Sequence, residues 1–473
     1  MKNKLNINTP TQLIIFGATG DLMAKKIVPA LFHLFERRQL PDFFKVVGFA
    51  RRPMTDKEFQ GFVSEKLSKN KGINAKSRSA FCKLFSYHQG SSQDENDYRA
   101  LSKNLNKIYD TQGVCANKLF YLAVPPQLYE IIFRNLAASG LVKPRGAEEG
   151  WTRIIVEKPF GKDLKTAEEL DALLGKLFKE IQIYRIDHYL AKEMLQNILA
   201  FRFFNNLFEM NWGNKLIERA HIRLLEKIGA EDRGNFYDGV GALRDVGQNH
   251  LLQILALIAM ERPTSLEAEP IRKNRAEILE TLKIPSETEI KSSTFRAQYN
   301  NYRAIQGVAP DSQTETYFKV SAFLNSTRWK GVPFILEGGK RLANKVKEIE
   351  FVFRHPTPCF CPKSGGVHYK NRLFIRLEPK EGITIEFWSK KPGLAMEVEK
   401  RNLDFIFRQG EQKTQYTEEY EKLLLDCVKG DQTLFASSKE VKAMWKFIDP
   451  IVTAWQKNKV PLKHYEPDTD VAI

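Results

Sequence analysis

The first 186 residues alternate between strand-like and helix-like segments, and this alternation restricts the fold more than any other feature of the sequence. Short apolar runs suited to strands lie at residues 12–16, 46–49, 118–124, 153–156 and 181–186. Segments with apolar residues at helical spacing follow the first and fourth runs, at residues 21–38 and 164–178. Strand–helix alternation of this kind favours a mainly parallel, doubly wound sheet. We therefore expect residues 1–186 to form a Rossmann-like α/β domain.

From residue 187 onward the pattern changes. Helices are expected near residues 190–203, 240–260, 416–427 and 438–455. Strand candidates lie at residues 218–227 and in the runs YFKVSAFL, KEIEFVF, NRLFIRLE and ITIEFWS of residues 317–388. Successive strands without intervening helices indicate a mostly antiparallel sheet with helices on one face. We expect residues 187–473 to form a larger α+β domain, with a cleft where it meets the first domain.

Composition excludes several classes of protein. The chain is 42% hydrophobic and 27% charged, which is typical of a globular protein rather than a disordered one. No apolar run approaches ~18 residues, so we expect no membrane span, and the run at residues 13–16 is too short for a signal peptide. Five cysteines without a CxxC pair, and no histidine cluster, predict a cytoplasmic protein with free thiols and no metal site.

The charge balance points to an anionic partner. Lys and Arg together number 73 against 57 Asp and Glu, a formal net charge of +16. Such an excess suits nucleic acid, an anionic membrane or small phosphorylated ligands, although a basic surface also simply keeps a protein in solution. The basic residues are scattered rather than gathered in a tail, which argues against a nucleic-acid-binding arm.

A glycine-containing turn directly follows the first predicted strand. It comprises Gly17, Ala18, Thr19, Gly20, Asp21 and Leu22, and it opens the predicted helix. Glycines permit a tight turn close to a phosphate, and a helix N-terminus offers free N–H groups and a positive dipole end. An ordinary strand–helix turn has the same appearance, since the third glycine of the dinucleotide fingerprint is missing.

Arginines follow the second predicted strand at once. An NAD site usually has Asp or Glu here, whereas Arg51 suits the 2′-phosphate of NADP. The alternative is that Arg51 and Arg52 are solvated surface residues. Coming after the glycine turn, Arg51 favours an NADP site.

Polar clusters occur at two further places. If Asp187 starts a helix, His188 and Lys192 share one face and form a phosphate clamp, although Asp187 could equally be a simple N-cap. Asp245 and His250 lie at the head of a helix whose later turns are apolar. A buried histidine beside a carboxylate is a natural general base, whereas a lone histidine is more often a satisfied core residue.

These stretches together resemble the glucose-6-phosphate dehydrogenase family. The matching segments, in the family's order and spacing, are GATGDL, EKPFG, RIDHYLAKEMLQN, RGNFYDGVGALRDVGQNHLLQ, AMERP and RWKGVPFILEGGKRLANK. The resemblance implies oxidation of D-glucose 6-phosphate to 6-phospho-D-glucono-1,5-lactone with NADP, the first step of the oxidative pentose phosphate pathway. It also implies a homodimer or homotetramer, with no nucleic-acid or membrane partner.

The resemblance assigns roles to individual residues. His250 matches the general base and Asp187 the carboxylate that orients it. The residues that match substrate ligands are His188, Tyr189, Lys192, Lys158, Glu226, Asp245, Lys340 and Lys345. Those that match the cofactor site are Gly17, Ala18, Thr19, Gly20, Asp21, Leu22, Arg51 and Lys158.

Two other functions remain open at this point. The same chemistry could act on a different hexose 6-phosphate, since only hydroxyl contacts separate these sugars. A nucleic-acid-binding protein would also use the +16 charge, but the chain lacks a zinc finger, an RNP aromatic motif and a basic tail.

Overall fold

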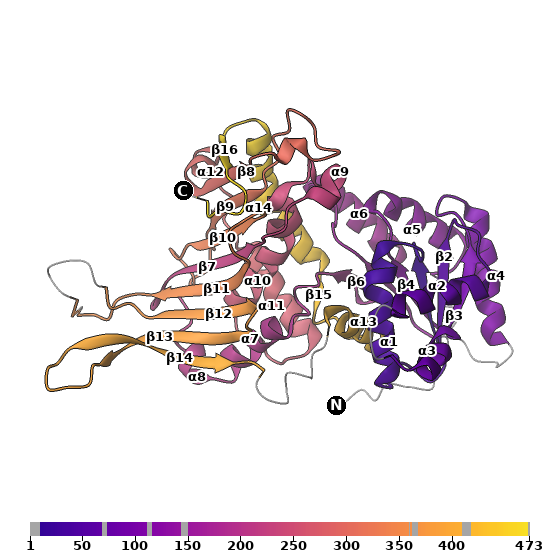
Figure 1. Cartoon of the computed structure of the whole chain (residues 1–473), viewed down its shortest axis with the longest axis horizontal. Helices are drawn as coiled ribbons and strands as arrows, with labels where there is room; N and C mark the ends of the chain where they lie inside the picture. Colours follow the sequence, from indigo (N-terminus) through magenta and orange to yellow (C-terminus); the bar gives the residue numbers. More distant parts are fainter. Residues whose placement is uncertain are drawn as a thin grey trace.

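Two β-sheets organise the molecule, one in each half of the view in Figure 1. The computed structural model describes residues 10–68, 73–110, 116–142, 150–358, 360–361, 368–408 and 418–471. The expected Rossmann-like α/β domain followed by a larger, mostly antiparallel α+β domain is confirmed. One continuous hydrophobic core joins the two sheets, from Leu13 to Val460.

The first sheet has seven strands in the order β15-β6-β5-β4-β1-β2-β3. Its six N-terminal strands are parallel, and helical crossovers connect each of them to the next. They are β1 (Thr11–Phe16), β2 (Phe44–Ala50), β3 (Phe85–Gln89), β4 (Asn117–Leu122), β5 (Thr152–Val156) and β6 (Ile183–Ile186). All six residues of β1 are buried, as expected for a central strand covered on both faces.

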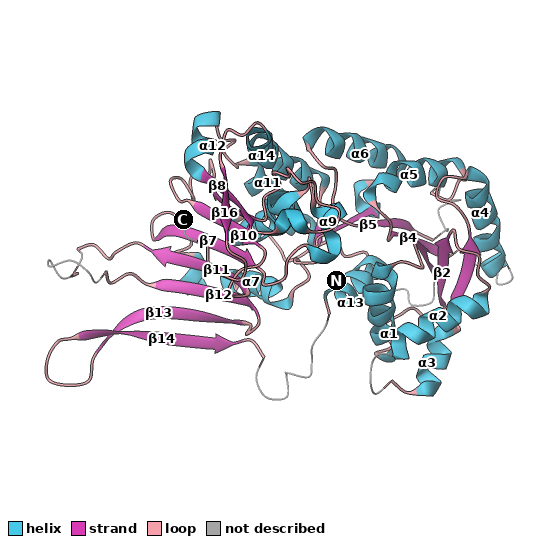
Figure 2. Ribbon diagram, turned by 45° about the horizontal axis from the view of Figure 1, so that its top comes forward, coloured by secondary structure: helices cyan, strands magenta, loops and turns pink. Residues whose placement is uncertain are grey.

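Helices cover both faces of this sheet (Figure 2). They are a π-helical turn η1 (Met23–Ile27), α1 (Val28–Glu36), α2 (Asp56–Ser68), α3 (Ala75–Cys82), α4 (Glu95–Asp110), α5 (Tyr129–Ala138) and α6 (Leu164–Leu177). β3 and the helices α2 to α5 were not predicted from the sequence. β3 (FSYHQ) is only partly buried and places polar residues at most of its positions, so its apolar signal is weak.

A C-terminal segment returns to the first sheet. The short strand β15 (Phe435–Ala436) pairs antiparallel with β6, and α13 (Glu419–Lys429) packs against α1. Arg275 fixes this return, because its buried guanidinium donates to the carbonyl oxygens of Thr433 and Phe435 and to Glu440. The first sheet is therefore completed by residues more than 240 positions beyond Ile186.

The second sheet has nine strands in the order β14-β13-β12-β11-β7-β10-β9-β8-β16. All neighbours are antiparallel except the pairs β7–β10 and β8–β16. The strands are β7 (Ile217–Leu225), β8 (Thr294–Tyr299), β9 (Tyr317–Ala322), β10 (Phe334–Gly339), β11 (Val346–Phe353), β12 (Arg372–Glu378), β13 (Gly382–Lys390), β14 (Val398–Ile406) and β16 (Leu462–Tyr465). β8, β10, β14 and β16 were not predicted from the sequence.

The helices of the second half pack mainly on one face of this sheet (Figure 1). They are α7 (Glu193–Phe203), α8 (Asn206–Glu209), α9 (Gly234–Tyr237), a π-helix η5 (Leu243–Leu251), α10 (Leu252–Ala259), α11 (Ala268–Glu280), α12 (Glu287–Ser293) and α14 (Ser438–Gln456). Every residue of α10 is buried, which explains why its sequence is apolar except at Gln253. Gly247 lets η5 approach the sheet, because a Cβ there would lie 2.9 Å from the ring of Phe318.

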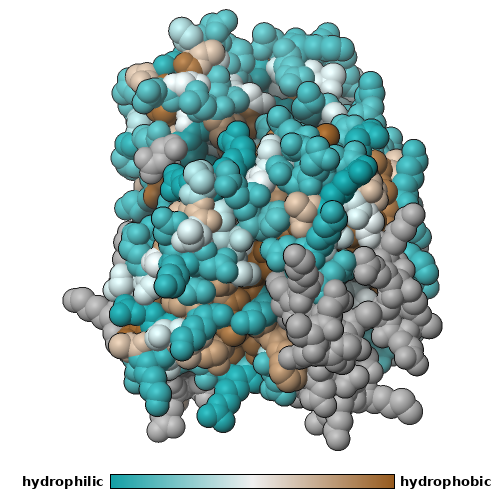
Figure 3. Space-filling view, turned by 90° about the vertical axis from the view of Figure 1, so that its right-hand side faces the viewer, coloured by the Kyte–Doolittle hydropathy of each residue, from teal (hydrophilic) through white to brown (hydrophobic). Residues whose placement is uncertain are grey.

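The outer face of the first domain is largely hydrophilic (Figure 3). Among the described residues, no helix combines the length and the apolarity that crossing a bilayer requires.

Candidate active site between the two sheets

Asp187 and His250 form a buried pair where the two domains meet. Asp187 directly follows β6, and His250 lies in η5. The two atoms His250 Nδ1 and Asp187 Oδ1 are 2.5 Å apart, and both side chains are 3% exposed. The family resemblance predicted this pairing across 63 residues, and the parallel strand and the π-helix bring it about.

Lys158 contacts the other nitrogen of the same imidazole. Its Nζ lies 2.9 Å from His250 Nε2 and also donates to the carbonyl oxygen of Asp245 at 2.9 Å. An ammonium group only donates, so Nε2 must accept, while Asp187 accepts from Nδ1. The two neighbours together place the proton on Nδ1 and leave a lone pair on Nε2. This is the tautomer that a general base requires.

The electrostatics also keep His250 neutral. Burial first, and then the charge of Lys158, lower the pKa of His250 well below its usual value. Burial opposes ionisation of Asp245, but the charge of Lys158 and then that of Arg233 outweigh it, so the pKa of Asp245 is lowered. The site therefore holds a neutral imidazole between charged neighbours.

Aromatic rings fix the plane of His250. The ring of Tyr189 stacks on it with centroids 4.1 Å apart, and His188 contacts it edge-on at 4.7 Å. Burial, and after it the proximity of His250, lower the pKa of His188 well below its usual value. Both residues come from the turn that follows β6.

The expected helix from Asp187 is not present. Residues 188–191 form turns, and α7 begins only at Glu193. Asp187 instead accepts a hydrogen bond from the backbone N–H of Tyr189 at 3.0 Å, which shapes the turn. His188 and Lys192 therefore do not share a helix face, and different neighbours hold each of them.

Three lysines converge on one carboxylate. Lys192 donates to Glu378 at 2.5 Å, and Lys345 and Lys347 lie 2.6 and 3.2 Å from its second oxygen. Lys192 also donates to Glu419 at 2.7 Å. The cations outweigh the effect of burial on Glu378, lowering its pKa to about 2, so it stays ionised. We call Lys192, Lys345, Lys347 and Glu378 the lysine cluster.

Lys192 and Lys345 were predicted from the sequence, whereas Lys347, Glu378 and Glu419 were not. Lys347 carried a usable signal, because it lies two residues after Lys345 and strand alternation turns both to one face. Nothing local marked Glu378, at the end of β12, or Glu419, at the start of α13.

The remaining predicted substrate residues form a second polar contact nearby. Lys340 is 7% exposed and donates to Glu226 at 2.7 Å. Glu226 follows β7 and Lys340 follows β10, and these strands are parallel neighbours, so their carboxyl ends coincide. Lys340 also lies over the ring of Tyr237 at 5.4 Å.

The glycine turn has the geometry that a phosphate approach needs. Gly17 has φ of +81°, and a Cβ there would lie 2.3 Å from the carbonyl oxygen of Ala123. The Gly20 N–H closes the turn on the Gly17 carbonyl at 2.9 Å, and Asp21 starts the helical segment. Arg51 is exposed directly after β2, on the same carboxyl edge of the sheet. These residues fit a dinucleotide with a 2′-phosphate.

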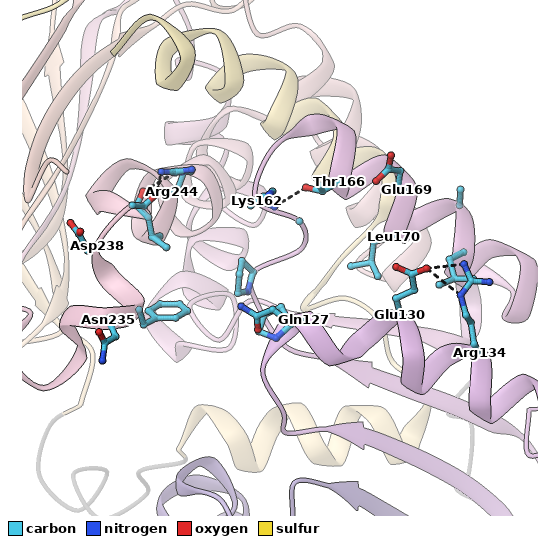
Figure 4. A pocket seen from close by; sticks show the side chains of 18 of the residues that line it. Gln127, Glu130, Arg134, Lys162, Thr166, Glu169, Leu170, Asn235, Asp238 and Arg244 are labelled. Atoms are coloured by element: carbon cyan, nitrogen blue, oxygen red, sulfur yellow. Dashed lines mark hydrogen bonds and ion pairs between the residues drawn. The ribbon is translucent and has the colours of Figure 1, made fainter. Parts of the chain in front are cut away.

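A cavity of about 1000 Å³ lies between the domains. Figure 4 shows Gln127 and Glu130 of the first domain facing Asn235 and Asp238 of the second across this space. Arg244, next to Asp245, also lines it. An interdomain cleft is therefore present, and its lining includes Pro159 and Arg244, the sequence neighbours of Lys158 and Asp245.

Two family models together cover nearly the whole chain. The model described as "Glucose-6-phosphate dehydrogenase, NAD binding domain" matches residues 14–197, and the one described as "Glucose-6-phosphate dehydrogenase, C-terminal domain" matches residues 199–471. The chain belongs to the glucose-6-phosphate dehydrogenase family.

Individual members of the family align over nearly all of this chain. A glucose-6-phosphate 1-dehydrogenase of Aggregatibacter actinomycetemcomitans is 41% identical, covering 93% of this chain and 90% of its own. A solved glucose-6-phosphate dehydrogenase in complex with its substrate glucose-6-phosphate has a TM-score of 0.89 at 32% identity, covering 98% and 96% of the two chains. The enzyme from Mycobacterium avium has a TM-score of 0.83 at 31% identity, covering 97% and 94%.

Proposed function

We propose that this protein oxidises D-glucose 6-phosphate to 6-phospho-D-glucono-1,5-lactone while reducing NADP to NADPH, the first step of the oxidative pentose phosphate pathway. Membership of the family supports the reaction. The observation that carries the mechanism is that Asp187 contacts one ring nitrogen of His250 and Lys158 the other, because these contacts fix the tautomer.

In the proposed mechanism, His250 Nε2 takes the proton of the C1 hydroxyl. Asp187 accepts the Nδ1 hydrogen bond throughout, orients the ring and stabilises the imidazolium that forms. Lys158 moves from Nε2 to contact the sugar and the cofactor. NADP held by the glycine turn and Arg51 would supply the acceptor for the hydride that leaves C1. The rings of Tyr189 and His188 hold the imidazole plane while the proton moves.

The lysine cluster is the proposed phosphate subsite. A sugar phosphate carries about −1.5 to −2 charges at neutral pH and replaces the single charge of Glu378 among the lysines. His188 and Tyr189 complete this subsite. Glu226, Asp245 and Lys340 would bind the sugar hydroxyls, and together these contacts place C1 beside His250.

The glycine turn and Arg51 form the proposed NADP site. The turn from Gly17 to Leu22 approaches the pyrophosphate at the start of a helix, where N–H groups and the dipole favour an anion. Arg51 pairs with the 2′-phosphate by charge-assisted hydrogen bonds.

We further propose a homodimer or homotetramer and a cytoplasmic location, with no nucleic-acid or membrane partner. The family resemblance supports the oligomer, and the free thiols of Cys82 and Cys427 support a reducing compartment. Light scattering after gel filtration measures the oligomer, and a monomer at micromolar concentration would contradict it.

The decisive experiment follows NADPH absorbance with glucose 6-phosphate as substrate. Free glucose and the 6-phosphates of mannose, galactose and fructose serve as comparisons, at equal concentration. Glucose 6-phosphate should give by far the highest kcat/KM. A higher kcat/KM for another hexose 6-phosphate would assign the protein a different substrate, and no turnover with any of them would reject the proposal. Filter binding at physiological salt tests the nucleic-acid alternative.

A further inference from the structure

Three side chains of types that can bind metals lie close together in the connection between β11 and β12. They are His355, Cys361 and His368, and one ligand atom of each lies within 4.8 Å of the others. Cys361 Sγ and His355 Nδ1 are 3.3 Å apart, and the two imidazole rings have centroids 5.1 Å apart. We call these three residues the hairpin cluster. The active site, the lysine cluster and the NADP residues use none of them.

Strand pairing brings the two histidines together. β11 ends at Phe353 and β12 begins at Arg372, and the N–H of Phe353 donates to the carbonyl oxygen of Asn371 at 3.0 Å. His355 and His368 lie just beyond this last paired position, on opposite sides of the connection. Antiparallel pairing therefore fixes the spacing of two ligands before any metal binds.

Further contacts anchor the base of the connection to the sheet. The Arg354 guanidinium donates to the carbonyl oxygen of Asn214 at 2.9 Å, and Lys370 pairs with Glu218 at 2.6 Å. The ring of Tyr369 packs on Trp388 with centroids 4.7 Å apart. The pairing of Lys370 with Glu218 also reduces the repulsion that this lysine would exert on a bound cation.

The chemistry of the cluster suits zinc. Zn²⁺ prefers thiolate and imidazole ligands, at about 2.3 Å for sulfur and about 2.0 Å for nitrogen, in tetrahedral geometry. These bond lengths place neighbouring ligand atoms roughly 3.5 Å apart, close to the observed 3.3 Å between His355 and Cys361. The backbone N–H of Tyr369 donates to Cys361 Sγ at 3.4 Å, which favours the thiolate.

We propose that His355, Cys361 and His368 bind one Zn²⁺ per chain. Binding converts the Cys361 thiol to a thiolate and releases its proton to solvent. Because His355 and Cys361 are half-buried and His368 is exposed, a metal from solution has access. The ion cross-links residues of the long connection between β11 and β12. It should therefore raise the free energy of unfolding and leave the dehydrogenase reaction unchanged.

The site lies at the opposite end of β11 and β12 from the lysine cluster. Lys347 is near the start of β11 and Glu378 ends β12, whereas the hairpin cluster lies beyond the end of β11 and before β12 (Figure 1). Loss of the metal should therefore leave kcat and KM for glucose 6-phosphate unchanged. Retained activity then shows that a variant is folded.

The test uses the untagged full-length chain, stripped with a chelator and kept reduced. Co²⁺ titration should reach one equivalent and give a thiolate-to-cobalt charge-transfer band with tetrahedral d–d bands, and one Zn²⁺ should displace it. Cys361→Ser should abolish the charge-transfer band, and His355→Ala and His368→Ala should each weaken binding at least tenfold. The matched control is His464→Ala, an exposed histidine of β16.

The cobalt spectra distinguish the hairpin cluster from another possible metal site. Asp187, His188 and His250 also lie within metal-binding distance of one another, but they offer no thiolate, so cobalt there gives no charge-transfer band. A band that survives Cys361→Ser and disappears in Cys359→Ser would overturn the proposal, as would no band in the unmodified chain. His368 is exposed, so His368→Ala carries the test if Cys361→Ser fails to fold.

Discussion

Lys158 Nζ lies 2.9 Å from His250 Nε2, at the nitrogen that must receive a proton during the proposed reaction. A cation there disfavours the imidazolium, and after burial it is the largest cause of the lowered pKa of His250. Removing the charge in Lys158→Met should raise that pKa. Less neutral base is then present at low pH, so the acid limb of the kcat/KM profile should move to higher pH.

The control for this prediction is Lys340→Met, because Lys340 contacts Glu226 rather than His250. That variant should raise KM and leave the acid limb in place. Identical acid limbs in Lys158→Met and the unmodified enzyme would show that Lys158 does not govern the titration of His250.

Substitution of His250 should remove the general base without removing the substrate site. We expect His250→Asn to lower kcat by ~10²–10⁴-fold, the usual contribution of a positioned base. The dissociation constant for glucose 6-phosphate, measured by calorimetry, should change little. Asp187→Asn should cost no more than His250→Asn, and the double variant should be far from additive because the two residues act as a unit. More than a tenth of the original kcat in folded His250→Asn would exclude this role.

In the proposed phosphate subsite, Glu378 should compete with the substrate phosphate for three lysines. Glu378→Gln keeps the shape of the side chain but removes its charge, so KM for glucose 6-phosphate should fall by about tenfold, equivalent to ~1.4 kcal/mol, at unchanged kcat. Lys192→Ala should raise KM for glucose 6-phosphate strongly and affect free glucose hardly at all.

The matched control is Glu386→Gln on β13, because Glu386 pairs with Lys400 away from the lysine cluster. It should leave KM unchanged. A KM that rises in Glu378→Gln would mean that Glu378 itself binds the substrate.

Arg51 should determine the choice of cofactor. Arg51→Ala removes the proposed partner of the 2′-phosphate, so KM for NADP should rise by about tenfold or more while KM for NAD changes little. Initial rates with each cofactor at saturating glucose 6-phosphate measure this. Equal losses with both cofactors would place the 2′-phosphate elsewhere.

The returning C-terminal segment should be essential for stability. Glu440 is fully buried and pairs with Arg275 at 2.8 Å, so Glu440→Ala leaves an uncompensated buried charge. We expect a loss of ~3–5 kcal/mol in the free energy of unfolding, measured by urea denaturation. Lys439→Ala, one residue away and exposed, should not change it measurably. A loss below about 1 kcal/mol for Glu440→Ala would mean that solvent or another cation compensates Arg275.

The local sequence determined much of this protein. Apolar runs of the first half set most of the parallel strands, and the residues at their carboxyl ends, such as Gly17 and Lys158, mark where ligands of such a sheet gather. The polar residues at the start of the apolar helix indicated His250 as a candidate general base. These features were predictable because periodicity and strand ends are encoded by neighbouring residues.

Only the tertiary structure decided the rest. Lys192 meets Glu378 and Glu419 across 186 and 227 residues, and β15 joins the first sheet from the far end of the chain. His355, Cys361 and His368 form no recognisable spacing in sequence, yet strand pairing gathers them. The physical reason is that periodicity specifies which face of an element is buried, whereas strand order and register, which arise from packing of the whole chain, specify which distant side chains meet.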